Sequence, residues 1–255
     1  MVRGGRRLKT IMTTFGKNEQ FIPYCVNALD HFWPEMSNLI IFSDQGNFSH
    51  GRKIISTESS WARMVLDCLN NSIRNDLLKL DEFVIILLED HIPHTRVPHD
   101  VIELMSEKLS DIDGVYVNLA GHGPGEPVLG IDGALLHHME FEWHSSLHPA
   151  IWSVRHFLDT LKFAIAQDQL SPWQFERLRL PGSVHYTTGY CVWPSPFGGF
   201  LVGGKVNRHA LATMKSGPNR FLCRKLLIRL MRELPGRLWR QASRRLSPRY
   251  RRRLA

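Results

Sequence analysis

The sequence has no hydrophobic run long enough to span a membrane, and it has few cysteines. Its apolar stretches fall short of the roughly 18 to 20 residues that a transmembrane helix needs. The N-terminus, MVRGGRRLKTIMTTF, is basic but lacks the apolar core and the small-residue cleavage site of a secretory signal. The four cysteines are scattered without a close Cys-x-x-Cys pair, so we expect reduced packing residues in a cytosolic chain.

The positive charge of the chain is unevenly distributed. Residues 219–255 hold thirteen Lys and Arg and one acid, a net of +12, whereas the preceding residues hold nineteen bases and twenty-three acids, a net of −4. The overall apolar fraction of 43% and charged fraction of 22% are ordinary for a globular protein. A mildly acidic body makes nucleic acid an unlikely partner of the globular part, and the basic end is suited to an anionic surface.

The pattern along the chain alternates strands and helices. Apolar runs predict strands over residues 8–15, 38–44, 53–56, 82–90 and 113–121, and helical spacing predicts helices over 21–31, 59–73, 98–110, 150–167 and from 171 onward. Residues 122–148 are rich in Gly, Pro and His and favour a loop or short hairpin. Strands separated by helices indicate an α/β fold with a mostly parallel sheet flanked by helices.

The stretch VIILLEDHIP places Glu89, Asp90 and His91 directly after a strand that is apolar throughout. Ligands of open α/β sheets bind beyond the carboxyl ends of the strands. Carboxylates there can hold a hard divalent cation, and the cation can neutralise the phosphates of a nucleotide. The alternative is that Asp90 only caps a turn while Glu89 is solvated.

Two further segments carry candidate site residues. In SSLHPAIW, His148 and Trp152 are suited to a sugar, since aromatic faces stack on sugar C–H surfaces and imidazoles bond hydroxyls. In SPWQFE, Glu176 lies one turn behind Trp173, and a carboxyl beside an aromatic ring can act as a general base with a raised pKa. The structural alternatives are a buried Trp152 at a helix N-terminus and an ordinary first-turn Glu176.

The order of these segments resembles bacterial glycosyltransferases of the GT-A type, found in surface-polysaccharide and lipid-carrier pathways. The resemblance runs from about Thr10 to Lys205. It comprises a strand near the start, a Trp-led helix at Trp61, LLEDH in the place of the acidic motif of the family, SSLHPAIW, SPWQFE and WPSPFGGFLVGGKV. Many members of the wider class have Asp-x-Asp where this chain has Glu89, Asp90 and His91.

The resemblance implies a GT-A-like, Rossmann-like fold and a nucleotide-sugar donor whose diphosphate lies near Asp90. It also implies an acidic residue on the acceptor side at Glu176. We therefore expect transfer of a sugar to a hydroxyl of a lipid-linked or surface glycan, with catalytic roles for Asp90 and Glu176. Glu89, His148, Trp152 and Trp173 are expected to bind substrate, and Asp90 is the candidate ligand of a divalent cation, Mn²⁺ or Mg²⁺.

Two other functions fit parts of the sequence. A metal-dependent hydrolase could use Asp90 with His91, His94 and His122, but neither His-x-His nor His-Glu-x-x-His occurs. A non-enzymatic protein could dock on membranes or polyanions through its basic end. Substitution of Asp90 separates the classes, since an enzyme would lose activity whereas a docking protein would still bind.

The C-terminal segment predicts a basic amphipathic helix. Arginines and a lysine lie between apolar residues that repeat at helical spacing. These apolar residues are Cys223, Leu226, Leu227, Leu230, Met231 and Leu234. Such a helix is suited to an anionic membrane surface, although packing on the core or RNA binding is also compatible with it. We expect a catalytic domain over 1–218 and a membrane-associating tail over 219–255, on the inner face of the cell membrane.

Overall fold

A computed structural model describes residues 8–121, 125–128, 134–137, 142–194, 199, 201–202 and 205–207. The chain separates into two compact units, residues 1–195 and 196–255. In the second unit, β10 (Leu201–Val202) pairs antiparallel with β11 (Lys205–Val206). The predicted boundary after residue 218 lies outside the described residues and stays a prediction.

The first unit contains a nine-stranded sheet in the order β3-β2-β1-β4-β8-β5-β9-β7-β6. Its strands are β1 (Lys9–Thr13), β2 (Ser37–Ser43), β3 (Arg52–Ile55), β4 (Phe83–Leu88), β5 (Tyr116–Asn118), β6 (Gly125–Pro127), β7 (Ala134–His137), β8 (Ala150–Ser153) and β9 (His185–Thr188). Only β8 and β7 run against the other seven strands. The predicted α/β class with a mostly parallel, helix-flanked sheet is confirmed.

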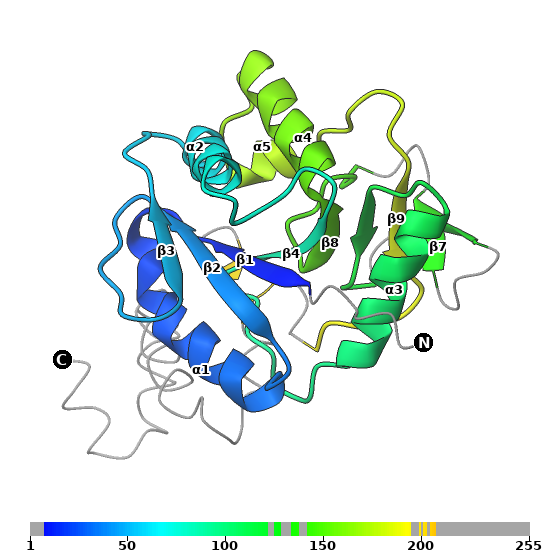
Figure 1. Cartoon of the computed structure of the whole chain (residues 1–255), viewed down its shortest axis with the longest axis horizontal. Helices are drawn as coiled ribbons and strands as arrows, with labels where there is room; N and C mark the ends of the chain where they lie inside the picture. The colour runs from blue at the N-terminus through cyan, green and yellow to red at the C-terminus, as the bar shows by residue number, and fades with distance from the viewer. Residues whose placement is uncertain are drawn as a thin grey trace, which may run out of the picture. The chain divides into compact units, whose positions relative to one another are not determined.

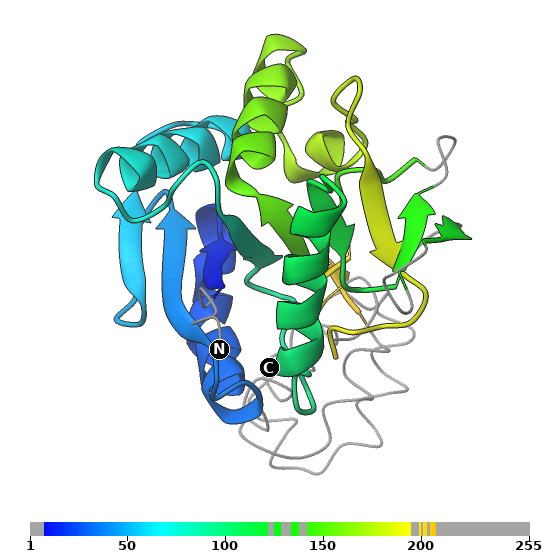
Figure 2. The same cartoon turned by 45° about the vertical axis from the view of Figure 1, so that its right-hand side comes forward.

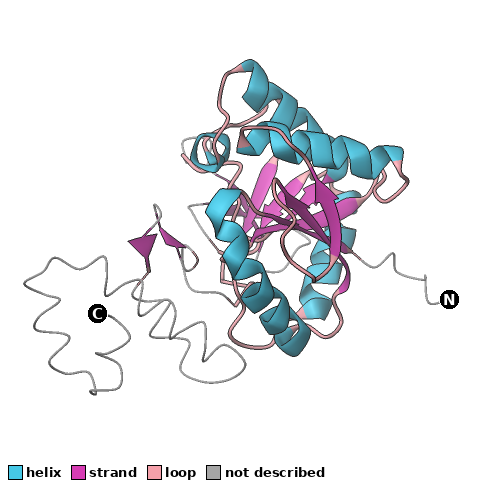
Figure 3. Cartoon of the chain, turned by 90° about the vertical axis from the view of Figure 1, so that its left-hand side faces the viewer, coloured by secondary structure: helices cyan, strands magenta, loops and turns pink. Residues whose placement is uncertain are grey.

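Helices cover both faces of this sheet (Figures 1 and 3). They are η1 (Gly16–Phe21), α1 (Ile22–Phe32), α2 (Trp61–Arg74), α3 (His99–Asp111), α4 (Val154–Ala166) and α5 (Pro172–Glu176). One core cluster joins α2, α4 and α5 to the strand side chains that point toward them, among them Ile86 and Trp152. Figure 2 shows α3 running along the opposite face, where Val97 N, just before α3, donates to Phe32 O at the end of α1.

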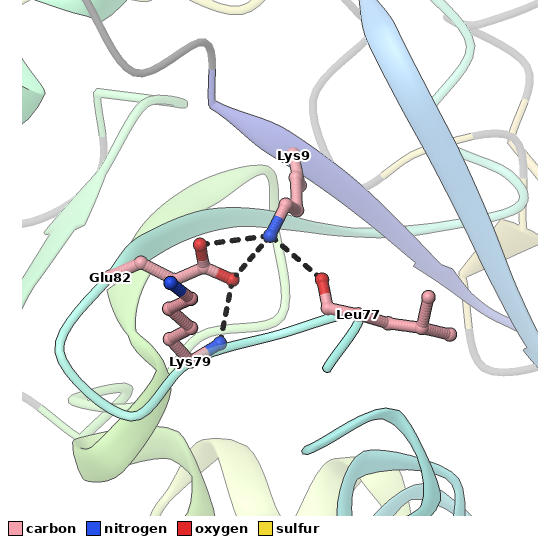
Figure 4. Close-up of polar contacts among 4 residues, drawn as sticks. All are labelled: Lys9, Leu77, Lys79 and Glu82. Atoms are coloured by element: carbon pink, nitrogen blue, oxygen red, sulfur yellow. Dashed lines mark hydrogen bonds and ion pairs between the residues drawn. The ribbon is translucent and has the colours of Figure 1, made fainter. Parts of the chain in front are cut away.

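The amino ends of the adjacent strands β1 and β4 are joined by a polar cluster (Figure 4). Lys9 Nζ donates to both carboxylate oxygens of Glu82 at 2.9 Å and to Leu77 O at 2.7 Å. Lys79 N donates to the same carboxylate at 2.9 Å. Since β1 and β4 are parallel and Lys9 pairs with Val84, this cluster fixes the register of the strands at the edge opposite their carboxyl ends.

One sequence prediction differs from the structure in detail. Residues 150–167 were expected to be one helix, but Ala150–Ser153 forms β8 and the helix begins at Val154. The three apolar side chains of β8 are buried between β4 and β5, and the Ser153 side chain accepts from His156 N as the N-cap of α4. The short hairpin predicted within 122–148 is confirmed, because β6 and β7 pair antiparallel.

Candidate active site

Glu89, Asp90 and His91 follow β4 directly, at the edge of the sheet where β1 and β2 also end. All three are buried, with exposed fractions of 3%, 6% and 3%. The five apolar residues before them fit a strand that is covered on both faces, and this burial brings the carboxyl groups out of water. Glu89 is therefore not the solvated residue of the alternative interpretation.

Burial changes the protonation of this acidic pair. It raises the pKa of Glu89 to about 8, with the neighbouring charge of Asp90 adding to the rise. A hydrogen bond with the side chain of Asn18 in η1 opposes it. The pKa of the Cys25 thiol in α1 is also raised. Burial of the thiol is the larger cause, and the charges of Glu89 and Asp90 add to it. Near neutral pH the pair thus holds a proton that a bound cation would displace.

The SSLHP segment lies against the LEDH segment. The rings of His91 and His148 are in contact, with centroids 4.7 Å apart. The contact follows from the topology: β8 runs antiparallel to β4, and Ala150 pairs with Ile86. The loop that precedes β8 therefore reaches the edge at which β4 ends.

Glu176 joins the third segment to the same loop. Its Oε1 accepts a hydrogen bond from Leu147 N at 2.8 Å, and its backbone O accepts one from Ser145 N at 3.1 Å. Ser171 and Gln174 form a capping box, which fixes the start of the short helix α5. The helix predicted from residue 171 onward is confirmed at its start, since α5 begins at Pro172 with Ser171 as its N-cap.

The pKa of the Glu176 carboxyl lies where the group can exchange a proton near neutral pH. Burial raises its pKa from 4.5 to about 7, although hydrogen bonds from Leu147 N and the Ser146 side chain lower it in part. A group with a pKa near the working pH is the most efficient general base. An ordinary solvated glutamate at the start of a helix would not show this rise.

A buried pair of histidines, His156 and His185, stabilises the loop 144–148, and the sequence did not predict this pair. His185 Nδ1 lies 2.7 Å from His144 O, and His185 Nε2 lies 2.8 Å from His156 Nε2. Because a carbonyl only accepts, His185 donates through Nδ1, and His156 donates to His185 Nε2. Tyr116 also donates to the loop, from its hydroxyl to Ser146 O at 3.2 Å.

A fourth segment reaches the site from residues 190–194. Trp193 Nε1 donates to His91 O at 3.1 Å, and His94 N donates to Pro194 O at 2.9 Å. Gly121 allows the close approach of this segment, since a Cβ there would lie 2.7 Å from the backbone of Tyr190. The family-like WPSPF stretch begins at Trp193, so its first residue contacts the LEDH motif.

The two predicted sugar-binding tryptophans lie in different environments. Trp152 has no exposed surface and packs in the core against Tyr116, His156 and Phe157. A fully enclosed indole offers no face to a sugar, so Trp152 is a residue of the core. Trp173 is 51% exposed on α5, three residues before Glu176.

Among the residues that the structure describes, the acidic pair is the candidate donor set for a cation. Among the described residues, no three His, Cys, Asp or Glu side chains are grouped so that they could hold a metal ion. His122 of the hydrolase alternative lies outside that part of the chain. Two adjacent carboxylates nevertheless fit Mg²⁺ or Mn²⁺, since such ions are often bound by one or two carboxylates together with substrate phosphates and water.

Comparisons with known proteins give distant structural likenesses only. No protein-family model and no curated protein sequence matches the chain. The chain is similar to a crystal structure of 4-diphosphocytidyl-2C-methyl-D-erythritol synthase, at 10% identity over 68% of this chain and 94% of that chain, with a TM-score of 0.39. It is also similar to UDP-glucose pyrophosphorylase complexed with UDP-glucose, at 8% identity over 71% and 89%, with a TM-score of 0.44.

Proposed function

We propose that the protein is a glycosyltransferase that moves a sugar from a nucleotide-sugar donor to a hydroxyl of a lipid-linked or surface glycan. Asp90, with Glu89, interacts with the donor diphosphate or with a cation bound to it. Glu176 is the general base for the acceptor hydroxyl, and His148, in the loop that Glu176 binds, contacts substrate. Trp173, which is half-exposed on α5, contacts sugar.

One observation carries this proposal: the loop before β8 makes contacts both with the segment that follows β4 and with Glu176 of α5. His91 contacts His148, His148 belongs to the loop that Glu176 binds, and Glu176 has a pKa raised to about 7. Sugar transfer to a hydroxyl needs groups that bind the donor diphosphate or its cation, and a group that accepts the proton of the hydroxyl. The acidic pair is suited to the first role, and Glu176 with its raised pKa is suited to the second.

The reaction itself follows from these positions. The acceptor oxygen forms a bond to the anomeric carbon, the bond from that carbon to the donor phosphate breaks, and the nucleoside diphosphate leaves with the electron pair. Glu176 accepts the acceptor proton. A cation held by Asp90 and Glu89 would supply positive charge to the diphosphate. Since Glu89 holds a proton near neutral pH, cation binding would release it.

The protein is further proposed to act at the inner face of the cell membrane, through residues 219–255. Their sequence carries +12 net charge and an apolar stripe, and they lie outside the described residues. None of the described helices is both long and apolar enough to cross a bilayer. A peripheral tail would bring the active site to a lipid-linked acceptor without a membrane span.

A thermal-shift screen of nucleotide sugars, with and without Mn²⁺, tests the proposal. A ligand that binds only the native state raises the melting temperature, so we expect stabilisation by at least one nucleotide sugar. Asp90→Asn should abolish the shift and the transfer while the fold survives, because the substitution removes a charge and opens no cavity. Asp111→Asn, on the exposed end of α3, is the matched control.

Full transfer by purified Asp90→Asn would refute the assignment of Asp90. A wild-type protein that is stabilised by none of the nucleotide sugars would refute the donor class. Hydrolysis of a phosphate or amide substrate that depends on added metal would instead favour the hydrolase.

A further inference from the structure

Two tryptophans form an aromatic pair beside the proposed general base. The rings of Trp143 and Trp173 meet edge to face, with centroids 5.5 Å apart. Trp173 is 51% exposed, and it is the most exposed tryptophan among the residues whose burial the structure describes. Large aromatic side chains are usually buried, so a paired and half-exposed indole at this position requires an explanation.

A charged pair holds the aromatic pair in place. Arg177 lies over the Trp143 ring at 4.9 Å from its centroid and forms an ion pair with Glu142 at 3.1 Å. The guanidinium therefore fixes the orientation of Trp143 from one side while Trp173 meets it from another. We call Trp143, Trp173, Arg177 and Glu142 the aromatic shelf.

The aromatic shelf adjoins the active site through both of its chain segments. Trp173 and Arg177 are on α5 or at its end, within one helical turn of Glu176. Glu142 and Trp143 directly precede the loop whose Leu147 N binds the Glu176 carboxylate. Residues three and four apart on a helix share one side, so Trp173 lies on the side of α5 that carries Glu176.

We infer that the aromatic shelf binds the acceptor carbohydrate and presents its hydroxyl to Glu176. This inference rests on the proposed function, whose donor lies at Asp90. An indole face stacks on the C–H face of a pyranose ring, and the guanidinium and carboxylate at its border donate to and accept from ring hydroxyls. The shelf supplies both kinds of contact next to the group that would take the proton.

The charges of the aromatic shelf favour a sugar over a lipid surface. Tryptophans that enter an anionic membrane are normally accompanied by uncompensated Lys and Arg. Here Glu142 neutralises Arg177, so the shelf has no net charge and would gain little from anionic lipid. A neutral pair of hydrogen-bonding groups fits the hydroxyls of a glycan.

Saccharide binding can be measured without knowledge of the natural acceptor. The probe is a set of soluble di- to tetrasaccharides of neutral hexoses, N-acetylhexosamines and 6-deoxyhexoses, titrated to tens of millimolar while tryptophan emission and ligand-detected NMR are recorded. We expect at least one saccharide to bind and to shift the tryptophan emission. Trp173→Ala should weaken that binding roughly tenfold, the scale of one lost aromatic stacking contact.

Matched variants separate binding from folding. Trp173→Phe keeps an aromatic face and should retain most of the affinity, and Leu104→Ala removes an equally exposed apolar side chain, 53% exposed on α3, and should change nothing. The inference is overturned if no saccharide binds, if Trp173→Ala binds as the wild type does, or if Trp173→Ala loses binding to phosphatidylglycerol vesicles instead of saccharide.

The same variants distinguish this inference from the proposed function. If nucleotide sugars still stabilise Trp173→Ala and saccharide binding is lost, both stand. If saccharides bind through the shelf and no nucleotide sugar stabilises the wild type, the shelf stands and the transferase proposal fails. If nucleotide sugars bind and the shelf variants transfer with an unchanged acceptor KM, the transferase stands and the shelf fails.

Discussion

Replacement of Glu176 by Gln should lower activity and raise stability at the same time. Gln keeps the shape of the side chain and an oxygen that can accept from Leu147 N, so the loop 144–148 should remain in place. It cannot take the acceptor proton. We expect turnover to fall by roughly 10²- to 10⁴-fold, the usual contribution of a general base, while donor binding persists.

The gain in stability follows from the raised pKa. The pKa of Glu176 rises from 4.5 to about 7 on folding because the carboxyl is buried. The native state therefore favours the protonated form, and the stability that this form contributes is present below pH 4.5 and lost as the pH rises through 7. At about 1.4 kcal/mol per pKa unit, the charged carboxylate costs about 3 kcal/mol at pH 8 and under about 1 kcal/mol at pH 5.

Two assays on the same purified variant test this reasoning. Urea unfolding at pH 5 and pH 8 should show Glu176→Gln more stable than the wild type, and more so at the higher pH. Release of nucleoside diphosphate in the presence of acceptor should show the loss of turnover. Glu107→Gln, on the exposed side of α3, should change neither quantity.

A variant that is less stable than the wild type at pH 8 would show that the Glu176 carboxylate is needed to hold the loop. A variant with unchanged turnover would reduce Glu176 to a structural residue.

Two further predictions concern the histidine pair and the tail. Burial lowers the pKa of His156 to about 4, so its contribution to stability is present above pH 6.5 and is lost as the pH falls toward 4, by up to about 3 kcal/mol. His156→Gln should remove much of the fall in melting temperature between pH 6.5 and 4, and a wild-type fall left intact in the variant would contradict this. Deletion of residues 219–255 should leave nucleotide-sugar binding unchanged and abolish binding to anionic vesicles, which in the full chain should weaken with salt. Equal vesicle binding by the truncated protein, or failure of that protein to fold, would contradict the tail hypothesis.

The sequence predicted the elements whose signal is local. The apolar run before Glu89 identified β4, and the helical pattern from residue 171 onward identified the start of α5. The carboxyl-edge position of Glu89, Asp90 and His91 followed from these without any structure, because ligand sites of parallel sheets gather at that edge.

The parts that depend on distant pairing were not predicted. The stretch Ala150–Ser153 has only four residues and continues into a helical pattern, so nothing local separated β8 from α4. Its reversed direction is what brings His148 against His91. The supporting contact between His156 and His185 likewise joins residues that no sequence spacing relates.

The pairing of β4 with β8 also bears on how the chain folds as it is synthesised. β4 ends at Leu88, and β8, which covers one of its edges, begins only at Ala150. The segment FVIILL has high β-propensity and no charge, and an unpaired strand of this kind is a template for aggregation. About sixty residues, some seconds of translation, separate the appearance of this edge from that of its partner. During that interval, the strand that precedes the acidic pair has one edge whose native partner has not yet been synthesised.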